Sequence, residues 1–67
     1  MNAKLLGKKI RLAIIESDLN QTNLAEEIGA SQKSISHYET GFSLPSLTTL
    51  TRIAKVLKKS TGYFLDD

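Results

Sequence analysis

The sequence predicts an all-α domain, a compact bundle of five helices. Three observations predict it: apolar residues recur at helical spacing, capping residues and glycines separate these runs, and 67 residues leave room for one small core. Hydrophobic residues make up 40% of the chain and charged residues 24%, which is typical of a globular protein and argues against disorder. We therefore expect a single domain over residues 1–67.

Residues 4–17 are expected to form the first helix. One face carries apolar side chains at i, i+4, i+7 and i+8, the spacing of a helix that packs on a core: Leu6, Ile10, Ala13 and Ile14. A second apolar side holds Leu5, Leu12 and Ile15. Either the small bundle covers this side as well, or it is a surface for a partner protein. Gly7 lowers helix stability by about 1 kcal/mol relative to alanine, so we expect the first turn to fray.

Residues 21–40 are expected to form two short helices separated by a tight turn. Asn20 is a good N-cap for the first of them. We expect no full capping box, because Asn23 stands where Glu or Gln normally reaches back. Gly29 takes a positive φ at little cost and is expected to end this helix, while Ser31 caps the next. Two short helices around a glycine turn have the outline of a helix-turn-helix.

The second helix of this motif, from Gln32 to Glu39, has two different sides on a helical wheel. One side holds Ser34, Ile35 and Tyr38. The other is wholly polar and lacks an acid: Gln32, Lys33, Ser36 and His37. Amide, ammonium, hydroxyl and imidazole groups hydrogen-bond base edges and phosphates, so this face is a candidate nucleic-acid surface. The alternative is an ordinary solvated face, but the partner helix before it favours the first interpretation.

The chain from residue 39 to 46 is expected to be a loop, because it contains Gly41 and Pro45. Ser46 can cap a helix over residues 47–57, whose apolar side is pronounced: Leu47, Leu50, Ile53, Ala54 and Leu57. The opposite side, expected in solvent, holds Thr48, Thr51, Arg52 and Lys55. A last helical turn capped by Ser60 is expected to close the core with Tyr63, Phe64 and Leu65, unless one of them stays exposed for a partner.

The composition excludes several classes of protein. The sequence has no cysteine, so it has no disulfide framework, thiolate metal site or cysteine nucleophile. One histidine and scattered carboxylates give no catalytic set and no metal site, so we expect neither an enzyme nor a cofactor. No apolar run approaches the roughly 18 residues of a membrane span and no signal peptide is visible. A soluble cytoplasmic protein is expected.

The formal net charge of +2 says little about partners, but basic residues cluster near both ends of the chain. They are Lys4, Lys8, Lys9 and Arg11 near the start, and Arg52, Lys55, Lys58 and Lys59 near the end. Such clusters attract polyanions by releasing counterions, although they are also common solubilising surface.

An ordered set of residues runs through nearly the whole chain, from about residue 8 to 65. It consists of Asn20-Gln21, Leu24-Ala25, Ile28-Gly29, Ser31, Ile35-Ser36, Tyr38-Glu39, Gly41, Pro45-Ser46, Thr49-Leu50, Ile53-Ala54 and Leu57. In this set the chain resembles the phage-repressor-like helix-turn-helix proteins of the Xre or Cro type. The resemblance implies a lambda-repressor-like DNA-binding domain with its helix-turn-helix at about residues 21–40. It also implies a sequence-specific double-stranded DNA-binding transcription regulator, more often a repressor, from a bacterium or its phage.

The resemblance further implies how the motif contacts DNA. Gln21 would contact a backbone phosphate, and the helix over residues 32–39 would enter the major groove. The base-reading candidates are Gln32, Lys33, Ser36 and His37. The phosphate candidates are Ser34, Thr40 and the loop 41–43 with Ser43. The Gln32 amide can pair with adenine and Lys33 can donate to guanine, each with about 1–3 kcal/mol of discrimination.

The resemblance also implies a two-fold dimer on paired half-sites. Two surfaces are candidates for the dimer contact: the last helix, Tyr63 to Leu65, and the stripe of Leu5, Leu12 and Ile15. An alternative function is a protein-interaction module, such as an antitoxin or accessory subunit, that keeps the fold and uses the extra apolar side of the first helix.

The chain departs from the family pattern at three places. One is Tyr38, which differs in shape from the usual residue and carries a hydroxyl that needs a partner. Ile14 stands where many members carry an arginine that pairs with the glutamate at the position of Glu39, so Glu39 needs another partner or faces water. Lys58 stands where the family often has a helix-ending glycine, and Lys59 where it often has a buried aliphatic residue. The packing of the last helix is therefore left open, although lysine can keep its charged end in water.

Overall fold

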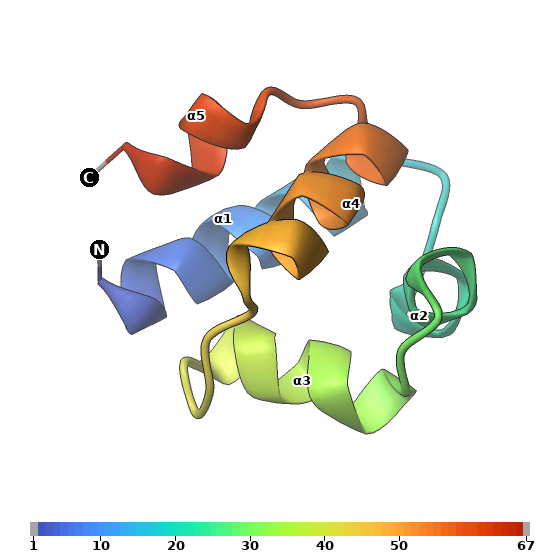
Figure 1. Ribbon diagram of the computed structural model, residues 1–67. Helices are drawn as coiled ribbons and strands as arrows, with labels where there is room; N and C mark the ends of the chain where they lie inside the picture. Colours follow the sequence, from blue (N-terminus) through green and yellow to red (C-terminus); the bar gives the residue numbers. More distant parts are fainter. Residues whose placement is uncertain (1, 67) are drawn as a thin grey trace.

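The computed structural model describes residues 2–66. These residues form five helices and no strand: α1 (Ala3–Glu16), α2 (Gln21–Ile28), α3 (Gln32–Thr40), α4 (Leu47–Leu57) and α5 (Thr61–Leu65). Figure 1 shows how the short helices enclose one interior. The all-α, five-helix fold predicted from the sequence is confirmed.

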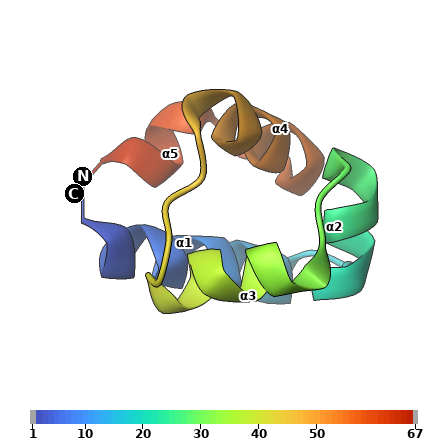
Figure 2. The same ribbon diagram turned by 60° about the horizontal axis from the view of Figure 1, so that its bottom comes forward.

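The helices form a closed ring of contacts around the core. α1 packs against α3 and α5, α2 packs against α3 and α4, and α4 packs against α5. Figure 2 shows α1 and α3 along one side of the molecule, α4 and α5 along the other, and α2 across one end. α3 is one member of this ring, so one of its sides meets the core and the opposite side faces outward.

The core takes side chains from all five helices. Its almost fully buried large side chains are Leu6, Ile10, Leu24, Ile35, Leu50, Ile53 and Phe64. One predicted core residue is wrong: Leu47 is 66% exposed. It is the first residue of α4, and the first side chain of this helix that reaches the core is Leu50, nearly one turn later. The predicted solvent side of α4, including Arg52 and Lys55, is exposed as expected.

A side chain caps the start of each helix. The caps are Asn2, Asn20, Ser31, Ser46 and Ser60, and each side-chain oxygen accepts a hydrogen bond from the backbone N–H three residues further on. The prediction that α2 lacks a capping box is wrong. The Asn20 side chain accepts from the Asn23 N–H at 2.8 Å, and Asn23 Oδ1 accepts from the Asn20 N–H at 3.3 Å. The asparagine side chain is one methylene shorter than glutamine but still reaches back here.

Gly7 is buried where α1 packs against the C-terminal end of α3. α1 is a regular helix from Ala3 onward, with Asn2 as its cap. The fraying of its first turn stays a prediction. The function of Gly7 is in packing: the backbone carbonyls of Tyr38 and Glu39 occupy the space where a side chain at position 7 would lie.

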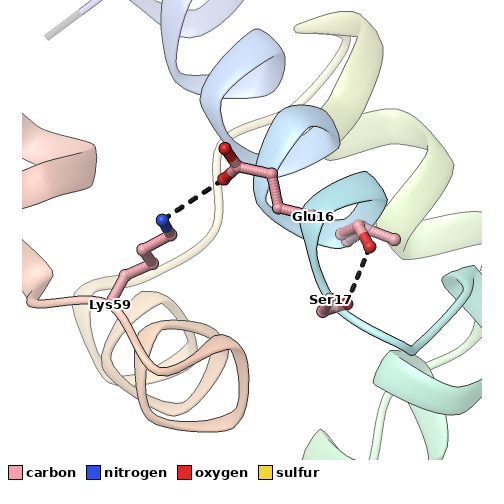
Figure 3. Close-up of polar contacts among 4 residues, drawn as sticks. Glu16, Ser17 and Lys59 are labelled. Carbon is pink, nitrogen blue, oxygen red and sulfur yellow. Dashed lines mark hydrogen bonds and ion pairs between the residues drawn. The ribbon is translucent and has the colours of Figure 1, made fainter.

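Lys58 and Lys59, which depart from the family pattern, lie in the connection from α4 to α5, and this connection accommodates both. Lys58 ends α4 in the left-handed conformation, with φ of 59°, which glycine adopts at lower cost. Lys59 Nζ forms an ion pair with Glu16 Oε1 at 3.2 Å, at the end of α1 (Figure 3). The same ammonium lies 4.9 Å from the centre of the Tyr63 ring. Lys59 therefore links α1 and α5 at the surface.

α5 closes the core mainly through Phe64, which is 2% exposed. Tyr63 packs at the edge of the core, and Leu65 is exposed. Lys9 Nζ donates to the carbonyl oxygens of Tyr63, at 3.1 Å, and Asp66, which ties the end of α5 to α1. Within residues 2–66, no helix has the length and apolar character that crossing a membrane requires.

Candidate nucleic-acid interface

α2 and α3 pack against each other across a tight turn. Gly29 ends α2 with φ of 71°, in the left-handed conformation expected for it, and Ser31 begins α3. The Ala30 N–H donates to the Ala25 carbonyl at 2.8 Å and closes the turn. Since both helices also anchor apolar side chains in the common core, the turn holds them at a fixed angle. This is the helix-turn-helix that the sequence predicts.

α3 sends one side chain fully into the core and presents polar groups outward. Ile35 is buried, and Tyr38 packs at the edge of the core. The base-reading candidates lie within one arc of the helix by their spacing, and all keep solvent exposure: Gln32, Lys33, Ser36 and His37. Figure 1 shows α3 at the periphery of the molecule, where its outward side can be approached.

The three hydroxyl candidates for phosphate contact lie at the two ends of α3. Ser34 is in the first turn, where its Oγ is 3.0 Å from the Ser31 Oγ. At the other end, Thr40 Oγ1 and the Ser43 backbone N–H both donate to the His37 carbonyl, at 3.2 and 3.3 Å. The structure therefore brings Thr40 and Ser43 together and leaves Ser34 apart from them.

Gln21, at the start of α2, joins α2 to both ends of α3. Its Nε2 donates to Glu39 Oε1 at 2.7 Å, and its Oε1 accepts from Gln32 Nε2 at 3.2 Å. Glu39 therefore has a partner although Ile14, buried in the core, replaces the arginine of the family pattern. We call Glu39, Gln21 and Gln32 the amide relay.

His37 contacts an aromatic ring that sequence reasoning missed. Its imidazole lies 4.5 Å from the Phe42 ring, measured between centroids, with 46° between the ring planes. Phe42 is 77% exposed in the loop after α3. The sequence did contain one signal for this contact: Phe42 is an aromatic residue in the polar loop that directly follows α3. Gly41, with φ of 79°, turns the chain into this loop.

Positive charge lies near both ends of α3. Lys33 is exposed in its first turn, and the backbone of the exposed Lys4 packs against Gly41 at its end. Glu39 is the one acidic residue of α3, and its carboxylate already accepts a hydrogen bond from Gln21. The outward side of α3 therefore combines hydrogen-bonding groups with positive flanks, a combination suited to a polyanion.

A second exposed surface lies on α1. Leu12 is 54% and Ile15 66% exposed, whereas Leu5 is half-buried. The alternative in which the bundle covers this whole side is therefore wrong for Leu12 and Ile15. α3 and α5 pack on other sides of α1 and leave these two side chains uncovered within residues 2–66.

The chain is similar to known proteins over nearly its full length. Residues 8–64 match the family model described as Helix-turn-helix. The uncharacterized HTH-type transcriptional regulator y4wC of Sinorhizobium fredii (strain NBRC 101917 / NGR234) is 32% identical over 62 residues. The match covers 92% of this chain and 43% of that relative, so the chain spans less than half of its length.

Two solved structures show the same arrangement of helices. The solution structure of the DNA-binding domain of the P22 C2 repressor has a TM-score of 0.88 at 31% identity, covering 97% of this chain and 86% of that one. The crystal structure of FeII HppE has a TM-score of 0.83 at 24% identity, covering 96% of this chain and 34% of that one. This second likeness shows a shared fold alone.

The family match over residues 8–64 and the likeness to the P22 C2 repressor domain agree with the motif built by α2 and α3. The resemblance found in the sequence is thereby confirmed. The chain belongs to the helix-turn-helix family, of the phage-repressor-like Xre or Cro type.

Proposed function

We propose that the chain is a sequence-specific double-stranded DNA-binding transcription regulator, more specifically a repressor, that reads the major groove with α3. The observation that carries this proposal is the outward side of α3, where Gln32 and Lys33 are exposed beside the half-buried Ser36 and His37. The names of two relatives support it, since one is an HTH-type transcriptional regulator and the other a repressor's DNA-binding domain.

In this proposal the side chains divide into two groups. Gln32, Lys33, Ser36 and His37 read base edges, with Lys33 donating to guanine and Gln32 pairing with adenine. Gln21, Ser34, Thr40 and Ser43 contact phosphates and set the register of α3 in the groove. The His37 carbonyl fixes the backbone of Ser43 at that end of α3, whereas Thr40 must turn its hydroxyl away from the same carbonyl to donate to a phosphate.

Selection of binding sites from a random duplex pool at physiological salt tests the proposal. We expect an enriched site that wild-type protein binds about 10³-fold or more tightly than a scrambled duplex. Lys33→Ala should relax the preference at one base pair, whereas Lys55→Ala, which removes the same charge from the outer side of α4, should not. A pool without enrichment, and binding that is only weak and salt-sensitive, would contradict sequence-specific regulation.

We also propose that the regulator binds DNA as a homodimer, because one domain this small makes few base contacts. Two copies on half-sites about one helical turn apart would double those contacts. Leu12 and Ile15 on α1, and Leu65 on α5, offer exposed apolar surface for the contact. The same α1 surface supports a second candidate function, a protein-interaction module such as an antitoxin or accessory subunit.

Catalysis is not part of the proposed function. The one histidine of the sequence, His37, lies on α3 with its ring against Phe42. The carboxylate nearest to it along α3, Glu39, is bonded to the Gln21 amide. These contacts support a binding surface. Because the proposed ligand is bacterial or phage DNA, we place the protein in the cytoplasm.

A further inference from the structure

The amide relay runs from a carboxylate to the outward side of α3. Glu39 lies near the C-terminal end of α3, and the relay returns through Gln21 of α2 to Gln32 at the start of α3. Glu39 and Gln21 are half-buried, whereas Gln32 is exposed. The exposed Gln32 is therefore held by Gln21, which is in turn held by Glu39, and both of these residues are partly protected from water.

Glu39 favours one direction for every hydrogen bond in the relay, and a phosphate that accepts the second N–H of Gln21 would favour the same direction. An ionised carboxylate only accepts, so Gln21 must turn its NH₂ group toward Glu39. Gln21 then faces Gln32 with its carbonyl oxygen, which also only accepts. Gln32 must therefore turn its own NH₂ group toward Gln21 and use one N–H there. Its second N–H and its Oε1 remain available.

The groups left on Gln32 match one base better than another. A donor beside an acceptor is complementary to the major-groove edge of adenine, which offers N7 as acceptor and N6–H₂ as donor. Guanine offers two acceptors, N7 and O6. If the Gln21 amide were reversed, its NH₂ group would face Gln32, and Gln32 would turn its oxygen inward. Both N–H groups of Gln32 would then face the DNA, the arrangement that suits guanine.

We propose that Glu39 is a positioning residue that makes Gln32 select adenine over guanine, acting through Gln21. This rests on the proposed function, because it assumes that α3 enters the major groove. The proposal adds a reason for the choice of base: Glu39, which itself touches no DNA, determines which groups Gln32 offers to the base. Glu39 contributes by being unable to donate a hydrogen bond.

Glu39→Gln tests this role with little change of shape. An amide at position 39 can donate as well as accept, so both orientations of Gln21 become possible. The probe is the duplex selected by the wild-type protein, with each adenine of the half-site replaced in turn by guanine. Wild-type protein should prefer adenine by about 5- to 150-fold at one position, and Glu39→Gln should lower that preference by at least about fivefold. Preferences at the other positions should be unchanged.

Glu27→Gln is the matched control. It removes the same charge from an exposed position of α2 outside the relay. Both variants should gain affinity for all DNA because a negative charge is lost, but only Glu39→Gln should lose the preference for adenine. In a Gln32→Ala background, Glu39→Gln should cause no further change in base preference.

Gln21→Ala provides a second route if Glu39→Gln folds poorly. It interrupts the relay while leaving Glu39 in place, and should lower the adenine preference together with overall affinity. An adenine preference that survives in both variants would overturn the positioning role and leave the proposed function standing. A further effect of Glu39→Gln in the Gln32→Ala background would also overturn it. Failure of wild-type protein to select any site would remove the proposed function, and this inference with it.

Discussion

Gly7 of α1 lies directly against the backbone carbonyl of Glu39 at the end of α3. A side-chain carbon on Gly7 would come within 2.4 Å of that oxygen and within 2.5 Å of the Tyr38 carbonyl oxygen. Both are backbone atoms, so they move only if α3 itself moves. The missing side chain at position 7 therefore determines how closely α1 approaches the helix that carries the candidate interface.

Gly7→Ala should lower the free energy of unfolding by about 1–3 kcal/mol, the usual cost of forcing extra volume into a packed site. Alanine favours a helix by about 1 kcal/mol over glycine, but the overlap with two carbonyls outweighs this gain. Chemical denaturation measures the change. Gly62→Ala in α5 is the control, because its nearest neighbour, Ser60 Oγ, would be 3.9 Å away. Equal effects at the two positions would contradict the packing argument.

Lys58→Gly should raise the free energy of unfolding by up to about 1 kcal/mol, because glycine avoids the cost of the left-handed conformation at the end of α4. The Lys58 side chain is exposed, so little packing is lost. Thermal unfolding would show the effect as a higher Tm. Lys55→Gly, in the last turn of the same helix, should instead destabilise by about 1 kcal/mol. A lower Tm for Lys58→Gly would show that its side chain makes contacts that outweigh the backbone gain.

Phe42→Ala should weaken base discrimination without weakening the fold. Because the ring is 77% exposed, we expect a change of at most about 0.5 kcal/mol in the free energy of unfolding. The His37 imidazole loses a ring contact of about 0.5–1.5 kcal/mol and gains freedom to rotate. Competition among duplexes with single base changes should show a reduced preference at the base pair that His37 reads. Leu44→Ala, in the same loop, serves as control, and an unchanged profile for Phe42→Ala would exclude a role for the ring.

Replacing Leu12 and Ile15 together by serine should weaken the proposed homodimer, because these are the most exposed apolar residues of α1. Unfolding should change little, since both side chains are already largely in water. Sedimentation equilibrium with a duplex of two half-sites measures the assembly. Leu65→Ser is the comparison. If only Leu65→Ser weakened the dimer, the contact would belong to α5 and the α1 surface would be free for another partner.

The sequence predicted the helices well because their signals are local. A cap and the apolar residues of the next two turns lie close together in the chain, as with Ser46, Leu50 and Ile53. The wrong expectations about burial concern Leu47 and, in the alternative where the bundle covers the second side of α1, Leu12 and Ile15; burial depends on which helix packs on which side. The close packing at Gly7 also depends on how the helices pack, because its neighbour is a carbonyl more than thirty residues away along the chain. The capping box of α2 was missed for a local reason, because asparagine is not the usual residue at position 23.

The candidate interface was predictable only in part. The polar character of α3 is visible in the sequence, and the exposure of Gln32 and Lys33 agrees with it. The amide relay is not visible, because it joins residues 18 and 11 positions apart through side chains that could also have faced water. The contact of His37 with Phe42 depends on how the loop after Gly41 turns. The contacts with DNA stay predictions.

The five capped helix starts also bear on how the chain reaches its folded state during synthesis. Each start is encoded within four neighbouring residues, so a helix can begin to form before the rest of the chain exists. The ring of contacts, however, closes only when α5 packs on α1, and Phe64 completes the core. Small helical domains fold within about microseconds to milliseconds, whereas a ribosome adds roughly 5–20 residues per second. Translation is therefore slower than folding, and the interface on α3 gains its full support only after α5 has been synthesised.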